Sequence, residues 1–270
     1  MKIALDKIVA PQVALRIYGL AGVGFGLVGL AWGDFAAVWQ PVPKTVPGRT
    51  ALAYAVAAVL LVAGLGVQWR RSAAAGALTL TILYSLGVIL LHVPSAIAHP
   101  SIFVMWSGIA EQLALVAGGT LAYASCALLA APTADRLVRI GRLLFGVCLI
   151  VFGLAHLFYL KATADFVPAW IPPGQLFWAY ATAAGHFAAG AAILSGIAAR
   201  LAALLLTAMF IVFSLLVHIP NLLSDPSHFN WAANAMNFAL IASAWVIAAS
   251  YLPAALPQRQ SAGFHEAALK

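Results

Sequence analysis

The sequence predicts an all-α membrane protein whose eight transmembrane helices form two parallel four-helix repeats. Three observations lead to this prediction. First, 64% of the 270 residues are hydrophobic and only 8% are charged, with a mean hydropathy of +1.00. Second, long apolar runs follow one another along the chain, and third, their pattern recurs 126 residues later. A soluble domain carries about 25% charged residues, and its core could not absorb this much apolar surface.

Eight apolar runs are long enough to cross the hydrocarbon layer, which is about 30 Å thick and needs about 20 helical residues. They cover residues 12–37, 50–69, 72–92, 102–130, 137–160, 175–197, 200–219 and 229–252. Such long, continuously apolar runs do not suit the strands of a barrel, so we expect helices. Pro and Gly cluster between the runs, and we expect Pro94 and Pro220 to end the third and seventh helices.

The basic residues orient the chain. Eleven of the 14 Lys and Arg residues lie on the side of both termini, and the other three are Lys44, Arg49 and Lys161. Basic residues are enriched on the cytoplasmic side of membrane proteins. We therefore expect a multi-pass protein of the bacterial cytoplasmic (inner) membrane with both termini in the cytoplasm. No small-residue cleavage site follows the first apolar run, so the first helix is expected to be retained.

The second half of the chain repeats the first. His92, Pro94 and Phe103 recur 126 residues later as His218, Pro220 and Phe229. An even number of helices per repeat gives both copies the same direction, so they should be related by a pseudo-twofold axis along the membrane normal. Residues 1–131 are the expected first repeat and residues 132–252 the second, joined near residues 131–136. Residues 253–270 are the expected short cytoplasmic tail.

Several functional classes are disfavoured by composition and motifs. The net charge of +7 does not indicate nucleic-acid binding, because it remains when basic residues flank membrane helices and acidic residues are scarce. Cys126 and Cys148 lie in or near apolar runs and indicate no disulfide framework. The chain contains no Cys-x-x-Cys, Walker or His-Glu-x-x-His motif. No metal ligand or catalytic residue is therefore predicted.

Histidines and one carboxylate interrupt the apolar runs. His186 and Glu111 lie at similar depth near mid-membrane, where an ionisable group is a candidate functional residue, and they could pair across the repeat interface. His156 lies in the outer quarter of its helix. Its estimated depth differs from that of His186 by about 10 Å at about 1.5 Å per residue, which disfavours these two as a haem-binding pair.

Each histidine also has a purely structural interpretation. A neutral imidazole can simply hydrogen-bond a neighbouring helix. His92 and His218 occupy equivalent His-x-Pro positions and are predicted to be structural helix ends, as C-terminal caps.

The two repeats differ in their polar residues. His156 and His186 correspond to Gly29 and Leu60 in the first repeat, and Glu111 corresponds to Asn237 in the second. A duplication that serves only the fold would not require this inequality.

Several motifs of the second half resemble a known family. They are Phe152-Gly153-Leu154-Ala155-His156, Val167-Pro168-Ala169-Trp170-Ile171-Pro172, Ala184-Gly185-His186-Phe187 and Arg200-Leu201-Ala202-Ala203. Together they resemble DoxX-like integral membrane proteins, which are usually single four-helix units, whereas this chain looks like a tandem duplication. The resemblance implies a membrane subunit tied to quinone-linked or thiol redox systems. This chain departs from the family pattern at His186, where an acidic residue is usual.

On this resemblance, we expect the protein to bind a small apolar redox molecule such as a quinone. The predicted ligand-binding residues are His186, His156, Glu111, Tyr180 and Trp170. Haem is the less favoured cofactor. The expected partners are the lipid bilayer, the apolar ligand and a partner oxidoreductase, and nucleic acid is not expected. Two alternatives stay open, namely a membrane carrier that uses the repeat interface and a non-catalytic scaffold for a partner oxidoreductase.

Overall fold

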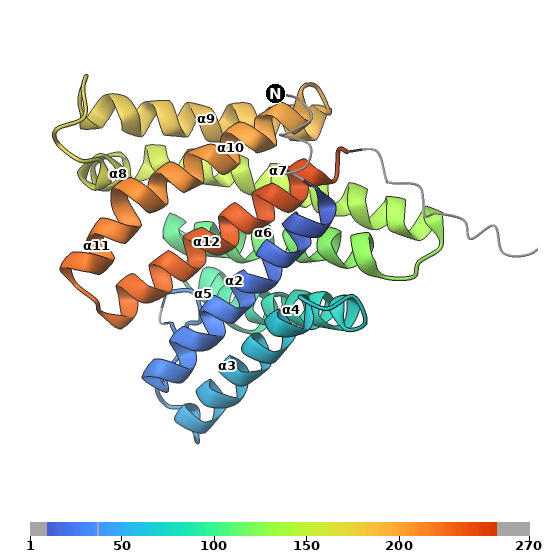
Figure 1. Ribbon diagram of the computed structural model, residues 1–270. Helices are drawn as coiled ribbons and strands as arrows, with labels where there is room; N and C mark the ends of the chain where they lie inside the picture. The colour runs from blue at the N-terminus through green and yellow to red at the C-terminus, as the bar shows by residue number, and fades with distance from the viewer. Residues whose placement is uncertain (1–9, 37, 253–270) are drawn as a thin grey trace, which may run out of the picture.

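The computed structural model describes residues 10–36 and 38–252, and this part of the chain contains helices and no strands (Figure 1). The long helices, in chain order, are α2 (Pro11–Trp32), α3 (Arg49–Gly66), α4 (Ala73–Gly87), α6 (Phe103–Cys126), α7 (Ala131–Phe158), α9 (Gln175–Ser195), α10 (Ala199–Phe213) and α12 (His228–Ala249). Shorter helices are η1 (Val88–His92), α5 (Val93–Ala98), α8 (Leu160–Phe166), η2 (Ser214–His218) and α11 (Ile219–Ser224). The all-α prediction is therefore confirmed.

Each predicted apolar run overlaps one of the long helices, and α7 begins six residues before its run of 137–160. Six helical stretches of the described residues are long and apolar enough to cross a membrane. These stretches are Pro11–Trp32, Arg49–Gly66, Ala73–Ala98, Ala131–Phe158, Ala199–Ser224 and His228–Ala249. Helices α6 and α9 are not among them, because polar side chains such as Glu111, Gln112 and His186 lower their mean hydropathy. The chain is thus a membrane protein with several spanning helices.

The prediction that Pro94 and Pro220 end their helices is wrong. Proline lacks the backbone N–H and collides with the carbonyl four residues earlier, which normally breaks an α-helix. Here the chain passes through a five-residue π-helix just before each proline, and the helix continues as α5 or α11. The N–H of Val93 bonds to the carbonyl of Val88, and the N–H of Ile219 bonds to that of Ser214. The wider π-turn makes room for the proline ring.

The predicted linker at residues 131–136 is also wrong. These residues form the first turns of α7, with Pro132 in the first turn, where its missing N–H removes no hydrogen bond. The break in the helical chain lies earlier, at residues 127–130. Proline thus starts a helix here, and residues 127–130 join α6 to α7.

The helices pack as neighbours in sequence and across the middle of the molecule. Helices α2, α3, α4 and α6 contact one another in order, and so do α7, α9, α10 and α12. In addition, α6 packs on α7, and α12 packs on both α2 and α6 (Figure 1). Small residues permit these close approaches. A β-carbon added to Gly118 of α6 would lie 2.5 Å from Oγ of Ser243 in α12.

The segment that joins α2 to α3 is fastened to the start of α12. The rings of Trp32 and His228 stack with centroids 5.1 Å apart, and those of Trp39 and Phe229 with centroids 5.7 Å apart. Asp34 forms an ion pair with Arg49 at the start of α3. The two ring stacks hold the segment between α2 and α3 against the start of α12.

Candidate ligand-binding site

Two histidines from different helices meet in the second half of the chain. His156 lies near the end of α7 and His186 lies in the middle of α9, and these helices pack against each other. The two imidazole ring centroids are 4.6 Å apart, with the ring planes inclined by 47°. We call these two residues the histidine pair.

The depth estimate that separated these residues by about 10 Å is therefore wrong. It assumed that α7 and α9 end at the same level. In the structure, α8 follows α7 immediately and packs along α9, and Gln175 at the start of α9 donates a hydrogen bond to the carbonyl of Val167 just beyond α8 (2.6 Å). The first turns of α9 thus run beside α8, which brings His186 level with His156.

The backbone fixes the tautomer of both rings. Nδ1 of His156 lies 2.9 Å from the carbonyl oxygen of Phe152, and Nδ1 of His186 lies 2.9 Å from that of Thr182. A carbonyl oxygen only accepts hydrogen bonds, so each Nδ1 carries the proton. Each Nε2 then presents a lone pair, and neither has a hydrogen-bond partner among the described residues. The pair can accept two hydrogen bonds.

Aromatic rings surround the histidine pair. The ring of Phe152 meets His186 edge-on at 5.8 Å, and Phe210 of α10 lies 5.7 Å from His186. Phe213 lies 6.4 Å from each of the two imidazoles. His186 is only 1% exposed, whereas His156 is half-buried. The arrangement combines two acceptors with a wall of apolar rings.

Glu111 lies outside this cluster, so its predicted pairing with His186 is not found. Its carboxylate accepts a hydrogen bond from the indole Nε1 of Trp39 (2.8 Å). The carbonyl oxygen of Trp39 in turn lies 3.1 Å from Nε2 of His92 and accepts a hydrogen bond from Nε2 of Gln112 (3.2 Å). These four residues form a second polar cluster, the Trp39 cluster, in the first half of the chain.

His92 and His218 occupy equivalent places at the ends of η1 and η2. The His92 ring binds the carbonyl of Trp39 on another segment, and so does not cap its own helix. The backbone carbonyl of His218 accepts a hydrogen bond from Asn234 of α12 (2.8 Å). Both residues thus connect a π-turn to its surroundings.

The two aromatic residues predicted to bind ligand lie apart from the histidine pair. Tyr180 of α9 is 50% exposed, six residues before His186 in the chain. Trp170 lies between α8 and α9 and is 74% exposed. Neither ring contacts an imidazole of the pair in the described part of the chain.

Several residues of the two clusters were not singled out from the sequence. Phe210 and Phe213 stand three positions apart, a spacing that places both on one face of α10. That spacing could have indicated a ring wall, but any apolar helix offers many such pairs. Trp39 lies outside the helices, and nothing in its local sequence indicates a bond to a residue 72 positions away.

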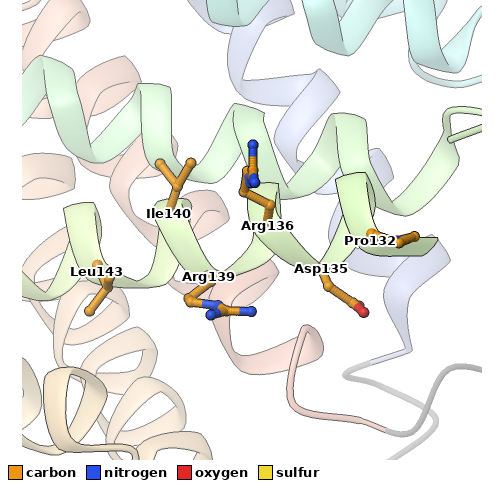
Figure 2. Close-up of a pocket in the computed structure, with 6 residues that line it drawn as sticks. All are labelled: Pro132, Asp135, Arg136, Arg139, Ile140 and Leu143. Atoms are coloured by element: carbon orange, nitrogen blue, oxygen red, sulfur yellow. The ribbon is translucent and has the colours of Figure 1, made fainter. Parts of the chain in front are cut away.

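A shallow hollow also lies along the first turns of α7, lined by Pro132, Asp135, Arg136, Arg139, Ile140 and Leu143 (Figure 2). All six residues come from one helix. Figure 2 shows Arg136 and Arg139 pointing in different directions, so the two guanidinium groups do not converge on a common ligand. The described residues also contain no group of three or more His, Cys, Asp or Glu side chains that could hold a metal ion.

Comparison with known proteins agrees with the resemblance of the second half. Residues 137–219 match the model of the DoxX family. No curated protein and no solved structure matches the chain. The matched segment begins in the first turns of α7 and ends at the start of α11, so it contains both members of the histidine pair and their ring wall. Residues 137–219 of this membrane protein are thus similar to the DoxX family.

Proposed function

We propose that the histidine pair binds a small apolar molecule that carries hydrogen-bond donors, in a membrane-linked redox system. The observation that carries this proposal is that both Nδ1 atoms are used by the backbone while both Nε2 atoms remain acceptors inside a ring wall. Such a site favours an aromatic ring with hydroxyl groups. A quinone in its reduced, quinol form has this chemistry.

The oxidised form is a poorer match. A quinone carbonyl oxygen only accepts hydrogen bonds, so it finds no donor at Nε2 of a neutral histidine with a protonated Nδ1. A quinol offers two O–H donors on a flat apolar ring. A site of this kind therefore distinguishes the two redox states through hydrogen bonding, because a ligand that leaves buried polar groups unpaired loses affinity.

The fold itself does not need two histidines at this place, if the chain is a tandem duplication. Two features favour duplication. Helices α4 and α10 have 15 residues each, and each leads into a five-residue π-helix and a six-residue α-helix. In addition, the contact of α6 with α7 corresponds to the contact of α12 with α2. The first half then has Gly29 and fully packed Leu60 in place of the two histidines.

We further propose that all eight long helices cross the bacterial inner membrane and that both termini are cytoplasmic. Eleven of the 14 basic residues lie on the side of the termini, which favours this orientation. Helices α6 and α9 can cross although they carry polar side chains, because neighbouring apolar helices shield those side chains from lipid. Helix α6 packs between α4, α7 and α12, and α9 packs on α7 and α10.

The carrier hypothesis has less support. A carrier that uses the repeat interface needs space between α6 and α12, yet Gly118 and Ser243 meet there in close contact. Residues 242–244 of α12 are fully buried, as are Ala114 and Ala117 of α6. The scaffold hypothesis remains as the outcome in which nothing binds.

The test is to purify the protein in mild detergent and measure its extracted small molecules by mass spectrometry. His186→Phe keeps an aromatic ring at this position but removes both ring nitrogens, including the acceptor Nε2, so the amount of bound quinol should fall about tenfold. This factor corresponds to about 1.4 kcal/mol, the order of one buried hydrogen bond. His218→Ala is the matched control and should retain the ligand.

Equal retention in His186→Phe and the parent would refute the role of Nε2. If the parent extracts contain no small molecule, and added quinol does not bind, the scaffold hypothesis replaces this one.

A further inference from the structure

We propose that Glu111 is a proton-binding site and that the proton it holds controls how the segment between α2 and α3 is fastened. This inference concerns the Trp39 cluster, which shares no residue with the histidine pair. It is independent of the proposed ligand.

Glu111 is short of donors. In the part of the chain that the structure describes, its carboxylate has a single hydrogen bond, from the indole of Trp39. The ion pairs among the described residues are Arg49–Asp34 and Lys161–Asp165, so Glu111 takes part in none. A charged carboxylate among apolar helices is costly unless it is paired and hydrogen-bonded. The protonated acid is therefore the form that suits the surroundings as described.

The two other side-chain donors of the Trp39 cluster bind the carbonyl of Trp39 and not the carboxylate of Glu111. Gln112 directly follows Glu111, and its amide donates to the carbonyl of Trp39. His92 reaches the same carbonyl through Nε2. Both side chains are buried, at 4% and 5% exposure, so they have few other partners to choose. His92 and Gln112 thus donate to the carbonyl of Trp39, and neither donates to Glu111, which suits a protonated carboxyl group.

Other titratable groups on the elements that pack against α6 do not pair with Glu111. Tyr18 of α2 donates to the carbonyl of Leu115. Arg142 of α7 binds Ser250, and His156 belongs to the histidine pair. His228 of α12 stacks on Trp32. Tyr84 of α4 meets the ring of Phe25 edge-on. His92 binds the carbonyl of Trp39, the residue whose indole binds the acid.

When Glu111 loses its proton, its carboxylate can accept more hydrogen bonds than the protonated acid. The proton passes from the carboxyl group to water, and the carboxylate that remains can accept the Gln112 amide in addition to the indole. The amide nitrogen of Gln112 has two N–H groups, so an amide that turns toward Glu111 weakens its bond to the carbonyl of Trp39, and His92 is then the main donor that holds this carbonyl. The packing of Gly108 limits the alternatives for His92, because a β-carbon there would lie 3.1 Å from Nδ1. Deprotonation should therefore loosen residues 38–48.

The first measurement is the infrared difference spectrum, in detergent, between buffer at about pH 6, where ordinary carboxyl groups are ionised, and alkaline buffer. A protonated carboxylic acid has a distinct C=O stretching band. We expect this band in the parent and in Asp165→Asn, which removes an exposed carboxylate. Glu111→Gln should lose it while keeping an acceptor for Trp39. Trp39→Phe should keep the band at a shifted frequency, because the C=O group loses its indole donor. A band that persists in Glu111→Gln, or that is missing from the parent, overturns the proposal.

The second measurement is hydrogen exchange of residues 38–48, corrected for the intrinsic pH dependence of exchange. In the parent, protection should fall at the pH at which the infrared band disappears. In Glu111→Gln it should be the same at both ends of the range. Protection that does not change in the parent, or that changes equally in Glu111→Gln, refutes the coupling to the loop.

Discussion

Replacing Arg142 by methionine should destabilise the protein by about 2–3 kcal/mol. Arg142 of α7 donates from Nε to Oγ of Ser250 (3.0 Å) and from Nη2 to the carbonyl of the same residue. Its guanidinium also lies 3.8 Å from the ring centroid of Tyr251. Hydrogen bonds that involve a charged group contribute about 1.5–3 kcal/mol, and a cation–π contact about 0.5–2 kcal/mol. The contributions share one side chain and do not add fully.

The consequence should be large because few other residues of α7 approach α12. For a chain of this size, about 2–3 kcal/mol lowers the melting temperature by roughly 4–12 °C. The assay is thermal unfolding in one detergent at fixed protein concentration. Arg139→Met is the matched control. Arg139 lies one turn earlier, is exposed, and makes no hydrogen bond or ion pair with the described residues. Arg142→Lys should lie between the parent and Arg142→Met, because lysine keeps the charge but not the planar fork.

The Tyr251 hydroxyl gives a second check on the same contact. This hydroxyl is buried and has no hydrogen-bond partner within residues 10–36 and 38–252. Burial raises the pKa of Tyr251, and the nearby charge of Arg142 opposes this only in part. The ring is therefore neutral at physiological pH. Tyr251→Phe should leave the melting temperature unchanged or raise it slightly, whereas Tyr251→Leu should lower it. Equal melting temperatures for Arg142→Met and Arg139→Met would refute the reasoning.

Two further predictions concern other contacts. Gly118→Val should cost about 1–3 kcal/mol by overpacking against Ser243, while Gly24→Val, where a β-carbon meets nothing within 4 Å, should cost little, and thermal unfolding of the two variants should separate them. Asp34 should stabilise the protein only above acidic pH. Burial alone would raise the pKa of its carboxyl, but the Phe35 N–H and Arg49 outweigh it and hold the pKa below its ordinary value. The ion pair is half exposed, so Asp34→Asn should cost about 0.2–1 kcal/mol at neutral pH. That difference should shrink as the pH falls below about 4, through the lowered pKa of the folded state. A difference that is constant with pH would contradict it.

Much of the fold follows from hydropathy alone. An apolar run that must satisfy its backbone in lipid has to be a helix, which is why each predicted run overlaps one. The π-turns before Pro94 and Pro220 could not be predicted in this way. Local preference says that proline stops a helix, and the extra residue that accommodates it leaves no mark in composition.

The histidine pair shows what limits a prediction of sites. His156 and His186 were both candidates, but their contact depends on where α9 starts relative to α8 and on how each helix is rotated. Neither quantity is encoded in one helix by itself. The bond between Trp39 and Glu111 likewise depends on how α6 packs beneath the segment that follows α2. Residue type identified several members of both clusters, and tertiary packing decided the partners.

The π-turns make the protein sensitive to chain length in a specific way. Each residue of an α-helix advances the rotation by about 100°, so an inserted or deleted residue turns everything beyond it by that angle. The π-turn at Val88–His92 holds the extra residue that sets the angle between α4 and α5. Deleting one residue there would remove the room for the Pro94 ring, and it would swing the His92 ring away from the carbonyl of Trp39. A one-residue change in length should thus be tolerated far less than an apolar substitution at the same place.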